Sequence, residues 1–534
     1  MEIQICILAS LAAITAGAYV LFASRQRPPS SSLAKLPLLN KRKATDIFGY
    51  RQKLNFFATA PALMSEGLRQ SPAGFRIMTA YGEDVVLPPQ FADELRRDSR
   101  LDAMKAAELE FLVHVPTLRP LSGGTVAEQI LLSAIARITR ALGKLIALDV
   151  ITMAQALIHL ISRVKGDLTE PVSGELNHAL EREWTSVHKD WHAVPLASTL
   201  ARIITQAASR VFAGPVLCRD PRWVDAMVSF SSSALRSATI LKFFPRILHR
   251  PLELFLPSCR KTRGHSRAAR ALIEPVLAEN KKKAESQAPG TRQETPKDAT
   301  VWLEEAAAGR YYDPLEAQLS LIFSASHTTA DFIAKLLLRL CENSELITAL
   351  REEVIATVGK GGAVSKEDIS NLKLMDSVMK ETHRMSPTLS ATMGRYVTDD
   401  MTLSTGLNLP AGTRVWVANT ATREPEVYPD PTRFDGRRYL RMREALAPSG
   451  KENLAQWVAT DPHNLAFGHG VHACPGRFFA NYMVKILLCH LLLKYDFKLA
   501  AGLDAERRVP FGFIVVTDPA TKLLIRRRES SDLM

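Results

Sequence analysis

The sequence predicts a mainly α-helical protein with small β-sheets and one transmembrane helix at its N-terminus. Apolar residues recur at helical spacing through most of the chain, and a strand-like pattern stands out only near Phe75. A nearly uncharged apolar segment from Ile3 to Ala23 has the length of roughly 20 residues that spans a bilayer. The 534 residues, of which 46% are hydrophobic, can bury a large core.

The N-terminal segment is predicted to be a retained membrane anchor, residues 1–24, because no convincing small-residue cleavage site follows it. Residues 25–45 form a basic hinge that contains a stiff Pro28-Pro29 pair. Six basic residues accumulate there: Arg25, Arg27, Lys35, Lys41, Arg42 and Lys43. The positive-inside rule therefore places the rest of the chain, residues 46–534, in the cytosol as one large domain.

The charge distribution and the spacing of the cysteines indicate which kinds of partner and which cellular compartment to expect. The formal net charge is +13, but lysine and arginine are scattered along the chain, which favours a solvated basic surface over nucleic-acid binding. The cysteines show no paired spacing, which argues for a reducing compartment and against a disulfide framework or structural zinc. They are Cys6, Cys218, Cys259, Cys341, Cys474 and Cys489.

Three further segments organise the large domain. Strand-like runs at Phe75–Thr79 and Glu83–Pro89, followed by a helix that begins at 92–96, predict a small antiparallel sheet. Residues 281–300 are rich in charge, Gln, Pro and Gly without apolar periodicity, and predict a surface linker. Residues 147–169 are apolar and are interpreted as an insertion, which is either an additional helix or translated sequence that is absent from the mature protein.

The most informative stretch is a glycine-rich loop that carries Cys474 just before a strong helix pattern starting at Arg477. A thiolate at a helix N-terminus is stabilised by the helix dipole and by backbone N–H groups, so we expect the pKa of this thiol to fall and the sulfur to become a good metal ligand. A nucleophilic or inert buried cysteine would explain neither the loop glycines nor the preceding aromatic Phe467.

This loop resembles the haem-binding loop of cytochromes P-450, with the pattern Phe-x-x-Gly-x-Arg-x-Cys-x-Gly. The match covers Phe467, Gly470, Cys474 and Gly476, while His472 stands where arginine is usual. The resemblance implies a cytochrome P-450 fold, haem b (iron protoporphyrin IX) as the cofactor and Cys474 as the axial ligand of its iron. His472 can still donate a hydrogen bond to a haem propionate, more weakly than arginine.

A second motif joins two distant segments. Glu381 and Arg384 share one helical face, which alone would indicate only a local surface pair. The run from Asp430 to Tyr439 resembles the family's Asp-Pro-x-x-Phe-x-Pro-Glu-Arg-Phe, with Gly436 and Arg437 in place of the usual proline and glutamate. The resemblance implies a buried structural triad of Glu381, Arg384 and Arg438.

A third motif concerns oxygen chemistry. The run Phe323–Ala330 resembles the family's Ala-Gly-x-(Asp/Glu)-Thr-Thr, with Ala325 for the glycine and His327 for the acid. Thr328 matches the threonine that delivers protons during oxygen activation. A mid-helix hydroxyl can bond to a carbonyl one turn earlier and open room there. His327 either relays protons near neutral pH or only packs and meets solvent.

The resemblance also implies where cofactor and substrate lie. Arg395, which we expect at the start of a strand, and His472 are the candidate propionate partners. Substrate contacts are expected from three largely apolar segments, Leu321–Ser324, Leu389–Met393 and Phe511–Val515, which favour a lipophilic small molecule.

The implied activity is that of a haem-thiolate monooxygenase acting on a lipophilic secondary metabolite, such as a terpenoid or indole diterpene. Stretches such as Ser209–Gly214 resemble fungal microsomal enzymes of the ent-kaurene oxidase type, and the resemblance runs from Leu36 to Arg527 apart from the insertion. It implies electrons from an NADPH–cytochrome P-450 reductase, allows cytochrome b5 as a second donor, and places the anchor in the endoplasmic-reticulum membrane. Two alternatives are a haem-thiolate isomerase or dehydratase that needs no O2, which has no use for Thr328, and a non-catalytic haem-binding protein.

Overall fold

The computed structural model describes residues 32–46, 49–121, 168–184, 190–286, 298–359, 364–420, 425–500, 502, 504 and 507–528. The predicted anchor at 1–24, the first part of the hinge, and the predicted insertion apart from Leu168 and Thr169 lie outside these residues.

Helices make up most of the described chain, and several of them begin at a cap that the sequence supplies. The helices are α2 (Tyr50–Gln70), α3 (Ala92–Leu95), α4 (Ala103–Glu110), α7 (Thr169–Glu183), α8 (Leu196–Phe212), α9 (Gly214–Cys218), α10 (Pro221–Leu241), α11 (Arg246–Phe255), α12 (Pro257–Glu285), α13 (Ala299–Ala307), α14 (Pro314–Cys341), α15 (Ser344–Val358), α16 (Lys366–Asn371), α17 (Lys373–Met385), α18 (Arg438–Leu446) and α19 (Arg477–Lys494). At α14 the Asp313 side chain accepts from the backbone N–H groups of Leu315 and Glu316, and Pro314 occupies the first turn.

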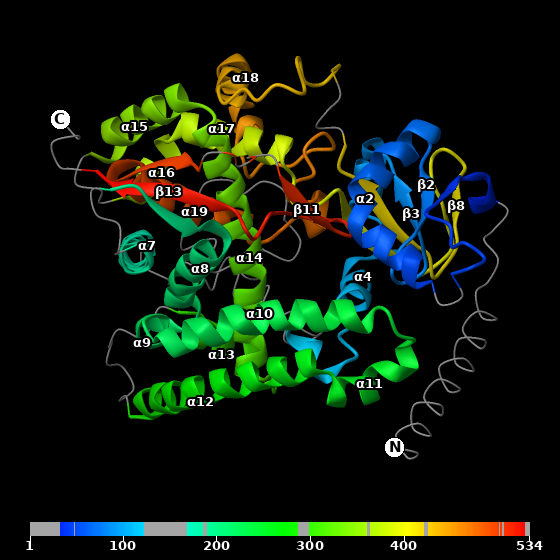
Figure 1. Ribbon diagram of the computed structural model, residues 1–534, viewed down its shortest axis with the longest axis horizontal. Coiled ribbons are helices and arrows are strands. Elements are labelled where there is room, and N and C mark those ends of the chain that lie inside the picture. Colours follow the sequence, from blue (N-terminus) through cyan, green and yellow to red (C-terminus); the bar gives the residue numbers. More distant parts are fainter. Residues whose placement is uncertain are drawn as a thin grey trace.

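The strands form one larger and three smaller sheets. They are β1 (Leu38–Leu39), β2 (Phe75–Met78), β3 (Glu83–Leu87), β4 (Leu101–Asp102), β5 (His192–Pro195), β6 (Ala391–Val397), β7 (Met401–Thr402), β8 (Asn408–Leu409), β9 (Arg414–Ala418), β10 (Tyr495–Leu499), β11 (Arg508–Phe511), β12 (Ile514–Thr517) and β13 (Lys522–Arg527). The six-stranded sheet has the order β1-β2-β3-β9-β6-β4 and lies with α2 at one end of the molecule (Figure 1).

Two expectations need correction. The strands β2 and β3 pair antiparallel as predicted, but they belong to a mixed sheet, because β3 also pairs in parallel with β9 from much later in the chain. The predicted linker 281–300 is shorter than expected. Helix α12 continues through Glu285 and α13 begins at Ala299. An exposed last turn needs no apolar periodicity, and Lys282 and Lys283 suit the negative end of the helix dipole.

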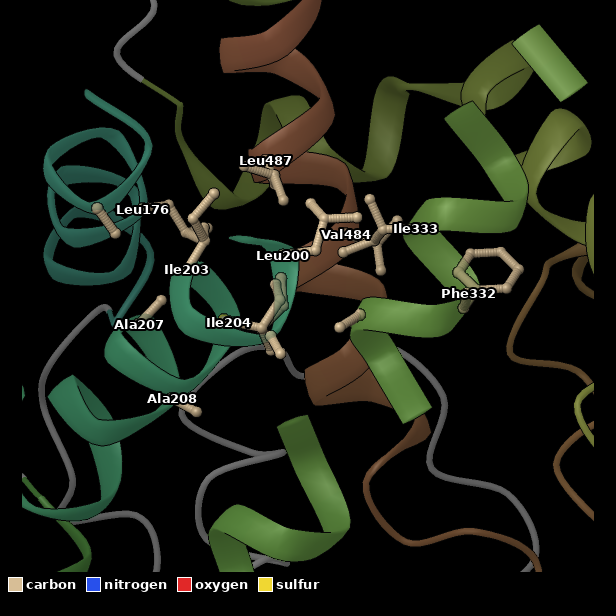
Figure 2. Close-up of a cluster of buried hydrophobic side chains, with 14 of the residues drawn as sticks. Leu176, Leu200, Ile203, Ile204, Ala207, Ala208, Phe332, Ile333, Val484 and Leu487 are labelled. Carbon is tan, nitrogen blue, oxygen red and sulfur yellow. The ribbon is translucent and has the colours of Figure 1, made fainter. Parts of the chain in front are cut away.

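Helix α14 runs through the middle of the molecule, between α10 on one side and α17 on the other (Figure 1). Among the described residues it is the one helix long and apolar enough to cross a membrane, but 67% of its most apolar stretch is buried inside the protein. It is therefore a core helix. Figure 2 shows that side chains from α8, α14 and α19 pack together in the core, among them Ile204, Ile333 and Val484.

Candidate functional site

Cys474 lies in the loop between a short 3-10 helix, Gly470–His472, and the N-terminus of α19. Its backbone N–H donates to the carbonyl oxygen of Phe467 at 2.8 Å, which closes the loop. Gly470 has φ +79°, and a Cβ added there would lie 2.4 Å from the Cβ of Arg96. Both the left-handed backbone and the close neighbour therefore require glycine at this position.

The surroundings of the Cys474 thiol act on its pKa in opposite directions. Burial raises the pKa, whereas a backbone N–H of Gly476 and the positive charge of Arg477 lower it. The residue as a whole keeps exposed surface, although the loop lies against the core. Burial has the larger effect, so the pKa of the free thiol is raised, whereas the loop pattern predicts a lowered one. The start of α19 still presents N–H groups and a cation to this sulfur.

Two residues in the middle of α14 are exposed, unlike the rest of the helix. Ser324 and Thr328, one turn apart, are exposed, whereas every other residue of the helix is buried or half-buried. Thr329 is buried and so points away from that face. The Nε2 atom of His327 is buried without a hydrogen-bond partner among the described residues, and burial lowers the pKa of its ring. At neutral pH His327 is therefore uncharged.

Arg395 is a buried cation with unused donors. It is the fifth residue of β6 and is 4% exposed, so the expectation that it starts the strand is wrong. Its Nη1 donates to the carbonyl oxygen of Gly394 at 2.9 Å, while Nε and Nη2 have no hydrogen-bond partner among the described residues. Burial lowers the pKa of Arg395 to about 10. A buried guanidinium in this state favours an anionic partner.

A β-bulge between Thr392 and Arg395 sets the direction of that arginine. Met393 within the bulge has φ +51°, a conformation that costs a non-glycine residue of order 1–3 kcal/mol. His472 lies within electrostatic reach, because the charge of Arg395, after burial itself, lowers the pKa of His472. The two predicted propionate partners therefore lie close enough to interact electrostatically.

The three members of the predicted triad meet in the core. The carboxylate of Glu381, 0% exposed, accepts from Arg384 Nε at 2.8 Å and Nη2 at 2.7 Å. Arg438 Nε donates to both oxygens of Glu381 at 3.2 Å. The guanidinium of Arg384 also donates to the carbonyl oxygen of Pro431, and the N–H of Asp435 donates to Glu381. The triad therefore ties α17 to the loop that precedes α18.

An open polar cleft of about 920 Å³ lies on the outer side of the triad, between the start of α15 and residues 429–441. Of the predicted site residues only Arg438 lines it. We assign it no part in the chemistry, because neither Cys474 nor Thr328 borders it.

An aromatic cluster that the sequence analysis did not predict packs against Phe467 of the cysteine loop. Phe467 packs edge-on against His383 and Trp457, with ring centroids 5.2 and 5.0 Å apart, and Trp457 stacks on Phe332 of α14 at 4.4 Å. The indole N–H of Trp457 donates to His383 Nδ1 at 3.0 Å. The position of His383 inside the Glu-x-x-Arg motif was a visible signal, but nothing in the sequence pointed to Trp457.

Comparison with known proteins gives the family. Residues 218–525 match the model of the family described as Cytochrome P450. The chain is 36% identical over 506 residues, 94% of this chain and 90% of the relative, to "Cytochrome P450 monooxygenase ntnM" of a Nectria species. It is 38% identical over 467 residues to "Cytochrome P450 monooxygenase trt6" of Aspergillus terreus, covering 87% and 88%. It is 36% identical over 487 residues to "Fumitremorgin C monooxygenase" of Aspergillus fumigatus, covering 91% and 90%.

A mainly helical fold with small sheets and this degree of similarity together define the class. The chain belongs to the cytochrome P-450 family, and it is a monooxygenase that acts on small molecules. The family implies a haem cofactor, and the residues present fit one. Backbone N–H groups face the Cys474 sulfur, the buried guanidinium of Arg395 has N–H donors without a partner among the described residues, and Ser324 and Thr328 are exposed in the middle of α14.

Proposed function

We propose that this enzyme binds haem b through the Cys474 thiolate and oxidises a lipophilic secondary metabolite with O2 and electrons from an NADPH-dependent reductase. The observation that carries the proposal is the placement of a reachable cysteine at the N-terminus of α19. When bound, the haem supplies the redox chemistry that activates oxygen.

The chain's own residues hold and orient that cofactor. The Cys474 sulfur would hold the haem iron as a thiolate, and the backbone N–H groups at the start of α19 favour this charged form against the opposing effect of burial. Phe467, Gly470 and Gly476 shape the loop. Arg395 donates its unused N–H groups to the cofactor's carboxylates, and His472 adds a weaker hydrogen bond.

Thr328 is the proposed proton-delivering group, because its hydroxyl lies on the exposed face of α14. His327 has two roles open to it. Its ring is neutral at physiological pH, so it can accept and pass on a proton, but its buried Nε2 also fits a packing role.

The substrate is proposed to be a lipophilic terpenoid, indole-containing or similar secondary metabolite. One relative's name specifies fumitremorgin C as its substrate. Within this chain the segments 389–393 and 511–515 lie side by side, joined by a bridge between Leu389 and Ile514, and their apolar side chains suit a lipophilic ligand.

Electron supply and membrane attachment complete the proposal. An NADPH–cytochrome P-450 reductase is the expected donor, with cytochrome b5 as a second one. Residues 1–24 anchor the protein in the endoplasmic-reticulum membrane, residues 25–45 form the hinge, and residues 46–534 form the cytosolic catalytic domain.

Two measurements on microsomes test this proposal. Product formation must depend on NADPH, reductase and O2, and turnover that needs none of the three would favour the isomerase or dehydratase alternative. Deletion of residues 1–24 should move the protein from the membrane pellet to the supernatant with haem still bound. Loss of haem on that deletion would show that the segment belongs to the fold.

A further inference from the structure

Helix α14 carries a buried ion pair just after Thr328. Lys335 Nζ lies 2.8 Å from Asp331 Oδ2, one turn away, with side-chain exposures of 0% and 11%. Burial lowers the pKa of Lys335 and the charge of Asp331 raises it, whereas Arg508 lowers it further. A lysine with no exposed surface is rare in a protein core unless its charge is paired.

Both members of the pair also bind the backbone of another segment. Lys335 Nζ donates to the carbonyl oxygen of Val515 at 2.7 Å and to Thr388 Oγ1 at 3.3 Å. Asp331 Oδ1 accepts from the backbone N–H of Thr517 at 2.7 Å. The pair therefore connects α14 with strand β12 and with the segment that enters β6.

Those two segments are in turn bonded to each other. The N–H of Val515 donates to the carbonyl oxygen of Thr388, and the N–H of Ser390 donates to that of Phe513, each at 2.8 Å. Segments 388–390 and 513–517 thus form one unit, which is fixed to α14 through Asp331 and Lys335. This unit overlaps the segments that we propose to contact the substrate.

We propose that Asp331 and Lys335 are a positioning pair that holds this unit against the helix bearing Thr328 and so sets the size and orientation of the substrate that the enzyme accepts. The proposal rests on the proposed function, because it requires that the unit face the substrate. Neither residue touches the reacting atoms. They act through Thr388, Val515 and Thr517, and a displacement of about 1 Å in such a wall can cost up to roughly 100-fold in rate.

The chain offers a matched control. Lys485 and Asp376 form a second buried pair, 2.8 Å apart with exposures of 4% and 6%. Lys485 Nζ donates to the carbonyl oxygens of Ile369 and Leu372, which belong to neither substrate-facing segment. Lys485→Met removes a buried charge as Lys335→Met does, but away from the proposed unit.

The test compares the haem-loaded parent with Lys335→Met, Asp331→Asn and Lys485→Met. Spectral titration with imidazole, which is small, and with clotrimazole, which is bulky, compares ligand binding at the iron with contact to the pocket walls. Hydrogen exchange of peptides covering 388–390 and 513–517 reports on the unit itself. If Lys335→Met does not fold, Asp331→Asn provides the test, because asparagine keeps an oxygen that accepts from the N–H of Thr517.

We expect Lys335→Met to shift the ratio of the clotrimazole and imidazole dissociation constants by about tenfold and to speed exchange in both segments. Lys485→Met should leave the ratio and those segments unchanged. An unchanged ratio with unchanged exchange overturns the proposal, and so does equal acceleration in both lysine variants, which indicates stability alone. If the parent protein lacks a thiolate-type spectrum, the proposed function is wrong. The hydrogen-exchange measurement then still tests whether Asp331 and Lys335 hold segments 388–390 and 513–517 against α14.

Discussion

The hydroxyl of Thr328 donates a hydrogen bond of 2.9 Å to the carbonyl oxygen of Ser324, one turn earlier in α14. Such a bond competes with the helix's own backbone bonding and leaves that carbonyl turned toward the side chain. Because both residues are exposed inside a largely buried helix, the hydroxyl lies where a small polar molecule can reach it. This relationship distinguishes Thr328 from its neighbour Thr329.

Thr328→Ala should uncouple electron flow from product formation. Haem and substrate binding should persist, while a larger share of the reducing equivalents ends as hydrogen peroxide, because proton delivery is impaired. The measurement is the ratio of product to NADPH consumed. Thr329→Ala is the control, since that side chain is buried about 100° further around the helix. Equal coupling in Thr328→Ala and the parent would assign proton delivery to another group, with His327 the next to test.

Glu381→Gln should destabilise the protein by about 3–5 kcal/mol, because it leaves Arg384 and Arg438 buried without their carboxylate. The loss should appear in the midpoint of urea unfolding and in haem retention. Arg441→Met is the control, since Arg441 pairs with Asp435 at the surface and such pairs contribute roughly 0–1 kcal/mol. Similar losses in the two variants would remove the structural role that we propose for the triad.

Arg395→Met should lower haem affinity while leaving the thiolate-type spectrum of the retained haem intact, because Arg395 is proposed to bind the periphery of the cofactor and not its iron. Arg395→Lys should recover part of the affinity, since lysine keeps a charge but not the planar donor set. Haem transfer to apomyoglobin measures the dissociation rate. An unchanged rate in Arg395→Met would show that its unused donors serve another partner.

His383 should make stability depend on pH. Burial, and then the charge of Lys335, lowers the pKa of His383 to about 3 from 6.5. The unfolded chain therefore binds this proton at a higher pH than the folded one, so stability falls as pH decreases from about 6.5 toward 3, by on the order of 4 kcal/mol in total. His383→Gln keeps an acceptor for Trp457 and should flatten the melting temperature between pH 6.5 and 4. A parallel pH profile in the variant would contradict this origin.

Much of the candidate site could be predicted from the sequence because its residues belong to local motifs. The loop around Cys474, the Thr328 position and the Glu381–Arg384 spacing are each set within a few residues, where glycine conformation and helix periodicity act directly. The linker boundary failed for a related reason. The exposed last turn of α12 has no apolar pattern to reveal it, and its composition is that of a loop.

The rest depends on contacts between distant segments. The burial of Arg395 depends on a β-bulge in which Met393 has a positive φ. No pattern of residues in the sequence predicts this bulge. The pairing of β3 with β9 and the contacts of Lys335 with Thr388 and Val515 join parts of the chain that only the tertiary fold brings together. These are the contacts that position the proposed substrate-facing segments.

The spectrum of the reduced, carbon monoxide-bound protein tests the central claim most directly. The parent and Cys489→Ala, which changes a buried cysteine of α19, should show the Soret band typical of thiolate-ligated haem. Cys474→Ser should lose that band. A Cys474→Ser variant that keeps the band would contradict the assignment of Cys474 as the axial ligand and with it the proposed site.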